Sequence, residues 1–160
     1  MRNIAANRRS DVALRNIQRD HRVNTRLLRR IALRLAERCF AGPACELTIC
    51  LLSASAMARL NTTHLQHSGP TDVITFDYSE PGSGGGVQGE IFLCVAEAGR
   101  QAREFRTTWQ QELVRYLVHG SLHLIGYDDR TPAKRRVMKR EENRLVRQLA
   151  REFDLGQLGR

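Results

Sequence analysis

The sequence Leu117-Val118-His119-Gly120-Ser121-Leu122-His123-Leu124-Ile125-Gly126-Tyr127-Asp128-Asp129 determines the predicted fold and chemistry of this chain. His119 and His123 are four residues apart, so on a helix both imidazoles lie on one face and can bind a single cation. Gly126 tolerates backbone angles that most residues resist, so the chain can fold back and bring Asp128 or Asp129 to the same point. Three protein ligands with an open position are typical of a catalytic zinc site.

The residues around this pair predict a helix with two different faces. At about 100° of rotation per residue, we expect the histidines to share their face with groups that orient an imidazole or bind an anion. A lone histidine is more often a hydrogen-bonded surface or core residue, but the pair, the glycine turn and the carboxylates together favour a metal. The apolar arc contains Leu113, Val114, Leu117, Val118, Leu124 and Ile125, and the polar arc contains Glu112, Arg115, Tyr116, His119 and His123.

The residue after the first histidine argues against a peptidase. The usual metalloprotease helix carries a glutamate there, which serves as the base that activates water. In this chain the position is Gly120. Peptide hydrolysis therefore becomes the weaker interpretation, and an open metal position must serve another chemistry or take its base from elsewhere in the fold.

The charge balance indicates a polyanionic partner. The chain has 26 Lys and Arg residues against 17 Asp and Glu residues, a formal net charge of +9 and a pI of about 10.4. Of the basic residues, 24 are arginines, whose planar guanidinium suits bidentate phosphate contact and stacking on bases. For any single basic run, the alternative to a polyanion-binding surface is a solvated helical surface with salt bridges and no binding role. Next to a hydrolytic metal, however, the cationic side chains favour phosphodiester chemistry.

The length and composition predict one cytoplasmic domain. At 160 residues the chain can bury one core but not comfortably two, so we expect a single metal-dependent hydrolase domain over residues 1–160. No stretch is apolar and long enough to span a bilayer, and the N-terminus lacks the apolar core of a secretion signal. The four cysteines lack zinc-ribbon spacing, and we expect them to be buried thiols without a functional role.

Periodicity and capping signals predict an α+β fold, with a small mixed four-stranded sheet packed against about five helices and the metal site on a central helix. We expect strands over 12–18, 45–52, 73–78 and 90–95. Residues 61–71 are interpreted as a loop, and the glycine-rich segment 81–89 as a hairpin connection rather than a phosphate loop. Helices are expected from a cap at Asn24 or Thr25 to about Phe40, after Ser53, over 96–105, after a cap at Thr107 or Thr108, and from Thr131-Pro132 with Val137, Leu145, Val146 and Leu149 inward.

Three segments carry a resemblance to a known family. The run 117–129 resembles the YbeY signature His-Gly-x-Leu-His-Leu-x-Gly-Tyr-Asp-His. Leu60-Asn61, Pro70-Thr71-Asp72-Val73-Ile74-Thr75-Phe76 and Gly89-Glu90-Ile91 are similar to further family motifs, and the order of elements agrees from about Val12 to Leu149. The YbeY family comprises bacterial metal-dependent endoribonucleases and rRNA maturation factors. The resemblance implies a zinc site, cleavage of single-stranded RNA, 16S rRNA 3′-end processing and ribosome quality control.

This chain departs from the family pattern at two positions. Asp129 aligns with the third histidine of the family, and Leu65 aligns with an arginine that could clamp a phosphate. Aspartate is a legitimate zinc ligand, but its charge weakens the Lewis acid and makes harder divalent metals better competitors. His64, His67 or Arg59 could replace the missing arginine, although each is more often a plain surface residue. For Asp72, hydrogen bonding to nearby backbone amides alone is the alternative interpretation.

Our leading interpretation is an RNA phosphodiesterase with one zinc ion per chain. His119, His123 and Asp129 hold the metal, and His119, His123 and Arg115 form the catalytic group, with Arg115 and nearby arginines holding flanking phosphates. The expected partners are 16S rRNA, the ribosome and ribosomal proteins, with no membrane. The alternatives are a catalytically weakened rRNA-binding assembly factor and a metal-dependent hydrolase of peptides or small substrates.

Overall fold

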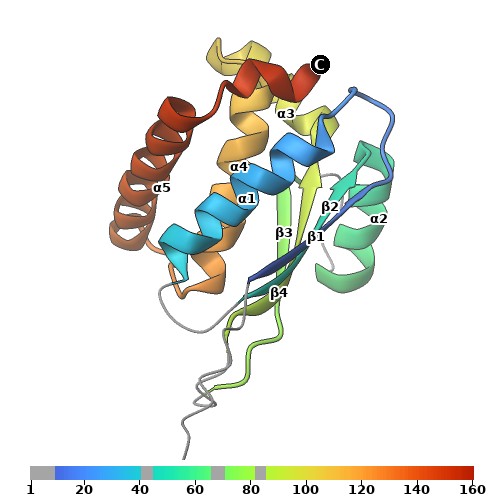
Figure 1. Ribbon diagram of the computed structural model, residues 1–160. Helices are drawn as coiled ribbons and strands as arrows, with labels where there is room; N and C mark the ends of the chain where they lie inside the picture. The colour runs from blue at the N-terminus through green and yellow to red at the C-terminus, as the bar shows by residue number, and fades with distance from the viewer. Residues whose placement is uncertain (1–9, 41–44, 66–70, 82–85) are drawn as a thin grey trace, which may run out of the picture.

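The structure, a computed structural model, shows one four-stranded sheet with helices on both of its faces (Figure 1). It describes residues 10–40, 45–65, 71–81 and 86–160. This arrangement confirms the predicted α+β class, with a mixed sheet and five α-helices in the described ranges. The elements are β1 (Asp11–Asn16), α1 (Thr25–Cys39), β2 (Glu46–Leu52), α2 (Ala54–Leu65), β3 (Val73–Asp77), β4 (Gln88–Cys94), α3 (Val95–Phe105), α4 (Trp109–Leu124), α5 (Pro132–Glu152) and a 3-10 helix η1 (Leu155–Gly159).

The sheet has the strand order β1-β2-β4-β3. β1, β2 and β4 are parallel, and β3 pairs antiparallel with β4 at one edge. The chain passes from β1 to β2 through α1, and from β2 to β4 through α2 and β3. The antiparallel register places Val73 opposite Leu93 and Asp77 opposite Gly89. β3 therefore begins at the end of the sheet where β4 runs into α3, and this is the end where Asp72 lies.

The two faces of the sheet carry cores of unequal size. Because side chains alternate along a strand, one set points toward α1 and α4, and the other set points toward α2. α5 packs on α4 and α1, farther from the sheet (Figure 1). The larger core contains Val12, Leu47, Ile49, Leu51, Ile91 and Leu93 from the strands. The smaller core contains Cys50, Leu52, Ile74 and Cys94, together with Met57 of α2.

Helix α4 lies in the middle of the larger core and packs on β3, β4, α3 and α5. At Gly120 it approaches the sheet so closely that an added Cβ would lie 2.8 Å from Ile91 Cγ2 and 3.0 Å from Thr75 Oγ1. The predicted polar arc of this helix is exposed only in part, because Glu112 and Tyr116 are 4% and 3% exposed. The helix is covered on most sides, and the polar site occupies only its C-terminal part.

Several predicted boundaries were wrong. The segment Asn61–Leu65, interpreted as loop, continues α2, because Asn61 is buried and the Thr62 hydroxyl donates to Ala58 O. Residues 88 and 89 belong to β4 rather than to the connection before it. Val137, predicted to face inward, is 48% exposed, and Met138 takes the inward position in α5.

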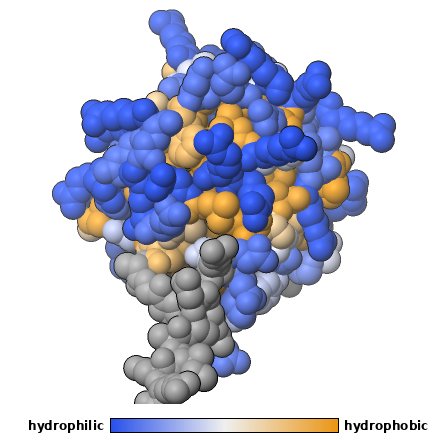
Figure 2. Space-filling view, in the orientation of Figure 1, coloured by the Kyte–Doolittle hydropathy of each residue, from blue (hydrophilic) through white to orange (hydrophobic). Residues whose placement is uncertain are grey.

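Charged side chains dominate the surface. On the face shown in Figure 2, hydrophilic residues cover most of the area over α1 and α5, with hydrophobic residues visible between them. The cysteines at 39, 45, 50 and 94 are free thiols, and three of them are buried. Along the described ranges, no helix combines the length and the apolar character that crossing a bilayer would need.

Candidate metal centre

The candidate metal centre is formed by the last two turns of α4 and the chain that folds back after it. Thr108 caps the start of α4 by accepting from Gln111 N–H. At its end, Gly126 has a φ of +95°, a left-handed backbone angle that favours glycine. Tyr127 N–H then bonds to Leu122 O, so the chain reverses against the helix. This reversal carries Asp129 back over the two histidines, as the glycine predicted.

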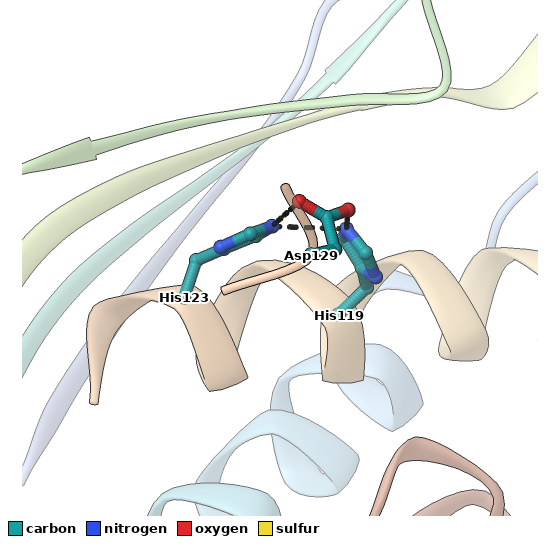
Figure 3. A group of neighbouring side chains, drawn as sticks. All are labelled: His119, His123 and Asp129. Carbon is teal, nitrogen blue, oxygen red and sulfur yellow. Dashed lines mark hydrogen bonds and ion pairs between the residues drawn. The ribbon is translucent and has the colours of Figure 1, made fainter. Parts of the chain in front are cut away.

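His119, His123 and Asp129 meet at one point (Figure 3). The two Nε2 atoms are 3.1 Å apart. Asp129 Oδ2 lies 3.7 Å from His119 Nε2, and Asp129 Oδ1 lies 3.9 Å from His123 Nε2. One donor atom from each residue lies within 4.8 Å of the others. Small rotamer adjustments would bring all three to the distances of about 2.0–2.2 Å at which zinc is bound.

The outer hydrogen bonds of both histidines fix which nitrogen is free to bind. His123 Nδ1 is 3.0 Å from the carbonyl oxygen of Tyr127, which can only accept, so Nδ1 carries the proton. His119 Nδ1 is 3.0 Å from Glu142 Oε2 and donates in the same way. The two Nε2 lone pairs therefore face one another beside a carboxylate. A divalent cation fits this donor set, because it would satisfy all three groups at once.

Glu142 is the functional residue that sequence analysis missed. Its side chain is 5% exposed, and it receives hydrogen bonds from His119 Nδ1, from Arg115 Nη1 at 2.7 Å and from Lys139 Nζ at 3.0 Å. Burial alone would raise the pKa of Glu142, but these three donors lower it to about 2. A permanently ionised carboxylate behind His119 orients the ring and increases its basicity.

The same surroundings affect the protonation of His119. Burial disfavours its charged form, but the hydrogen bond and charge of Glu142, with the charges of Asp72 and Asp129, raise the pKa of His119 above its ordinary value. The negative field that holds a proton at Nε2 also attracts a cation, so metal and proton compete for this nitrogen.

The two aspartates after the turn have different partners. Asp128 accepts from Lys134 Nζ at 2.9 Å and from Arg130 N–H at 3.1 Å, and the Lys134 hydrogen bond is the main cause that lowers the pKa of Asp128. Only Asp129 reaches the two imidazoles. Local sequence geometry allowed either Asp128 or Asp129 to reach the histidines, and in the structure it is Asp129 that does so.

Two cavities lie beside the triad, and both are lined by Asp72, His119 and Asp129. The first, of about 510 Å³, extends along β3 past Thr75 and His123. The second, of about 440 Å³, extends toward α5 and α3 and is lined also by Gln101, Arg115, Tyr116, Arg135, Met138, Lys139 and Glu142. The cluster is thus open on two sides to a substrate larger than a single small molecule.

Of the cationic residues singled out from the sequence, Arg115 lies near the site and lines the second cavity. Arg115 is committed to Glu142 and to Asn143 Oδ1, so its expected contact with a phosphate stays a prediction. His64 packs edge-on against Phe76, and among the described residues neither His64 nor Arg59 lines the two cavities. His67 lies outside the described residues, and Leu65 is the last residue of α2.

The α+β fold combines with a His-His-Asp cluster that could hold a metal ion, formed by a helix and the turn after it. The chain belongs to the endoribonuclease YbeY family, whose sequence model matches residues 12–150. The membership inferred from the helix motif is therefore confirmed.

Relatives and a solved structure agree with this assignment. The chain is 41% identical over 108 residues to endoribonuclease YbeY of Chlorobium luteolum, a match that covers 68% of this chain and 77% of the relative. It is 36% identical over 136 residues to endoribonuclease YbeY of Chlorobium phaeovibrioides, with 85% and 88% covered. The solution structure of TM1509 from Thermotoga maritima is similar with a TM-score of 0.63 and 25% identity, covering 89% of this chain and 91% of that one.

Proposed function

We propose that this chain is a zinc-dependent, single-strand-specific endoribonuclease that acts in the cytoplasm on 16S rRNA 3′ ends and in ribosome quality control. Membership of the endoribonuclease YbeY family supports RNA cleavage. The convergence of His119, His123 and Asp129 supports a metal, and this is the observation that carries the proposal. Residues 1–160 would act as one hydrolase domain, with the ribosome and ribosomal proteins as partners.

The residues of the site have two kinds of role, since some bind the metal ion and others orient or neutralise the groups around it. His119, His123 and Asp129 hold the ion, which when bound supplies Lewis acidity toward a phosphate oxygen. Glu142 fixes the His119 ring, and Arg115 and Lys139 neutralise Glu142. A carboxylate as third ligand weakens that acidity and admits harder divalent ions as competitors.

Arg135 is the cation best placed to hold a flanking phosphate. Its Nε donates to Asp129 O at 3.2 Å, which fixes the guanidinium at the rim of the second cavity and leaves its other donors available. Arg136, the next residue on α5, is exposed and lines neither cavity. The pair provides a matched test, because we expect Arg135→Ala to weaken RNA binding and reduce its salt dependence more than Arg136→Ala.

The activity is tested with a single-stranded RNA and its duplex, using protein purified without a metal-affinity tag. We expect cleavage of the single strand that chelator abolishes, that zinc restores and that His119→Ala lacks. Equal cleavage by wild type and His119→Ala would indicate a contaminant. Tight RNA binding without cleavage, unaffected by chelator, would instead indicate the assembly-factor function.

A further inference from the structure

The hydrolytic site needs a group that accepts a proton from the attacking hydroxyl. In metalloproteases that group follows the first histidine, but here the position is Gly120. The structure shows why no side chain can lie there, since even a Cβ would be 2.8 Å from Ile91 Cγ2 and 3.0 Å from Thr75 Oγ1. This side of α4 faces the sheet, so the acceptor must come from another element.

Most carboxylates near the triad are already engaged. Glu142 is saturated by His119, Arg115 and Lys139, and it lies behind the His119 ring on the side away from the cluster. Asp128 is paired with Lys134. Asp129 belongs to the metal-binding triad itself. Of the described residues that line either cavity beside His119, Asp72 and Asp77 remain.

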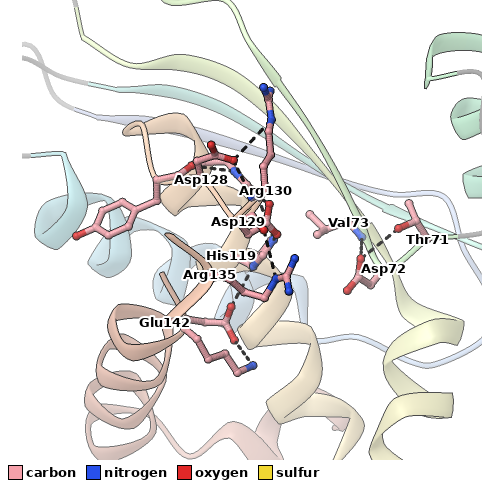
Figure 4. Close-up of polar contacts among 12 residues, drawn as sticks. Thr71, Asp72, Val73, His119, Asp128, Asp129, Arg130, Arg135 and Glu142 are labelled. Atoms are coloured by element: carbon pink, nitrogen blue, oxygen red, sulfur yellow. Dashed lines mark hydrogen bonds and ion pairs between the residues drawn. The ribbon is translucent and has the colours of Figure 1, made fainter. Parts of the chain in front are cut away.

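Asp72 lies where a proton acceptor is needed. It stands just before β3, and its backbone is fixed by the hydrogen bond from Cys94 N–H to Asp72 O. Its Oδ1 accepts from Val73 N–H at 2.8 Å and from the Thr71 hydroxyl at 3.2 Å. Within the described residues nothing bonds to Oδ2. Figure 4 shows Asp72 on the strand side of the site, opposite His119 and Asp129.

Two further observations place the Asp72 carboxylate at the reaction centre rather than at its edge. Asp72 is the only residue outside the triad and its helix that lines both cavities, among those the structure describes. Asp77, by contrast, lies at the other end of β3, is exposed, and accepts from Ser79 N–H through Oδ1. A carboxylate anchored beside the triad therefore precedes β3, and an exposed carboxylate ends it.

We propose that Asp72 is the general base of the cleavage reaction, an inference that rests on the proposed endoribonuclease function. Asp72 Oδ2 takes the proton of the attacking hydroxyl while the oxygen of that hydroxyl forms its bond to phosphorus. The bond from phosphorus to the leaving ribose oxygen breaks, and that oxygen takes a proton from solvent. Asp72 then releases its proton to water, so the carboxylate is regenerated and no further reactant is consumed.

The test compares Asp72→Asn with Asp77→Asn, which changes the net charge by the same amount at the other end of β3. Asparagine retains the oxygen that accepts from Val73 N–H and the Thr71 hydroxyl, so the local turn is preserved. Both variants and the wild type are assayed for zinc per chain, thermal unfolding, RNA affinity and single-turnover cleavage between pH 5 and 9.

We expect Asp72→Asn to slow single-turnover cleavage by about 10²–10⁴-fold. Zinc content, unfolding temperature and RNA affinity of Asp72→Asn should match those of the wild type, and Asp77→Asn should cleave far faster than Asp72→Asn. Normal cleavage by Asp72→Asn would overturn the assignment, and so would loss of zinc, which would make Asp72 a ligand. Zinc-independent cleavage by the wild type would instead overturn the proposed function.

Discussion

The two ring nitrogens of His119 face two different environments. On the Nδ1 side, the Glu142 side chain is 5% exposed and receives hydrogen bonds from three residues. On the Nε2 side, the side chains of His123 and Asp129 are 31% and 41% exposed, and two cavities open beside them. One side is closed and fully paired, and the other presents donor atoms that face one another.

The two nitrogens of one imidazole therefore have different roles, because Nδ1 fixes the orientation of the ring and Nε2 is free to bind an ion. A buried, fully paired carboxylate holds the ring in one orientation. Burying its charge costs desolvation free energy, which its three hydrogen-bond partners offset. The open side keeps the lone pairs available for an ion and leaves room for a substrate. Substitutions on the open side should therefore abolish metal binding, whereas substitutions on the closed side should only lower the affinity for the metal.

The largest effect is expected on the open side, from His123→Ala. Removing one imidazole leaves two ligands, so zinc content should fall to near zero. Cleavage should fall by about 1000-fold or more, since the metal supplies several kcal/mol of transition-state stabilisation. Zinc per chain and cleavage rate measure this directly. A variant that retains one zinc per chain would contradict the assignment of His123 as a ligand.

A smaller effect is expected on the closed side, from Glu142→Gln. Loss of the charged acceptor behind His119 should weaken zinc affinity by about 10–100-fold without abolishing it. Glu141→Gln is the matched control, because Glu141 pairs with Arg144 and does not contact the histidine. Competition with a chelator of known affinity separates the two variants. Equal zinc affinities for both would remove Glu142 from the metal centre.

On the sheet-facing side of the same helix turn, Gly120→Ala tests packing rather than chemistry. A methyl group there would meet Ile91 Cγ2 and Thr75 Oγ1, so the free energy of unfolding should fall by about 1–3 kcal/mol. Helix propensity alone predicts the opposite sign, a gain of about 1 kcal/mol. Urea unfolding of zinc-free protein distinguishes the two, and a more stable variant would show that the close approach is relaxed in solution.

The smallest effect is expected from Asp128→Asn, next to the third ligand. Asp128 pairs with Lys134 and Arg130 at the surface, and exposed pairs of this kind contribute little. Zinc affinity and cleavage should stay within about twofold of the wild type. A large loss of zinc in Asp128→Asn, with little loss in Asp129→Asn, would exchange the roles of the two aspartates.

The sequence predicted the open side of the site better than the closed side. His119 and His123 belong to one helix and Gly126 to the turn after it, so their meeting depends on local geometry alone. Local geometry left both Asp128 and Asp129 open, and only the family resemblance favoured Asp129. The ion pair of Asp128 with Lys134 on α5 shows that Asp128 is directed away from the histidines.

Glu142 was missed because it is 23 residues from His119 and lies in a helix full of charges. A signal was nonetheless present. Glu142 has helical spacing with Met138, Leu145 and Leu149, all of them buried. An acidic residue on the apolar face of a helix must find a buried partner, so this pattern predicts a functional carboxylate.

The end of α2 was missed for a different reason. Asn61, Thr62 and Thr63 are poor helix formers, and local propensity favours a loop there. In the structure Asn61 is buried, and the Thr62 hydroxyl bonds back to the helix. Tertiary burial therefore extends α2 by residues whose own preferences would end it.

Anomalous diffraction at the zinc edge, from crystals grown with zinc, tests the metal centre most directly. We predict one strong peak per chain, at about 2.0–2.2 Å from His119 Nε2, His123 Nε2 and an oxygen of Asp129. Well-ordered crystals of zinc-replete protein in which these three side chains point apart, with no peak between them, would contradict the account.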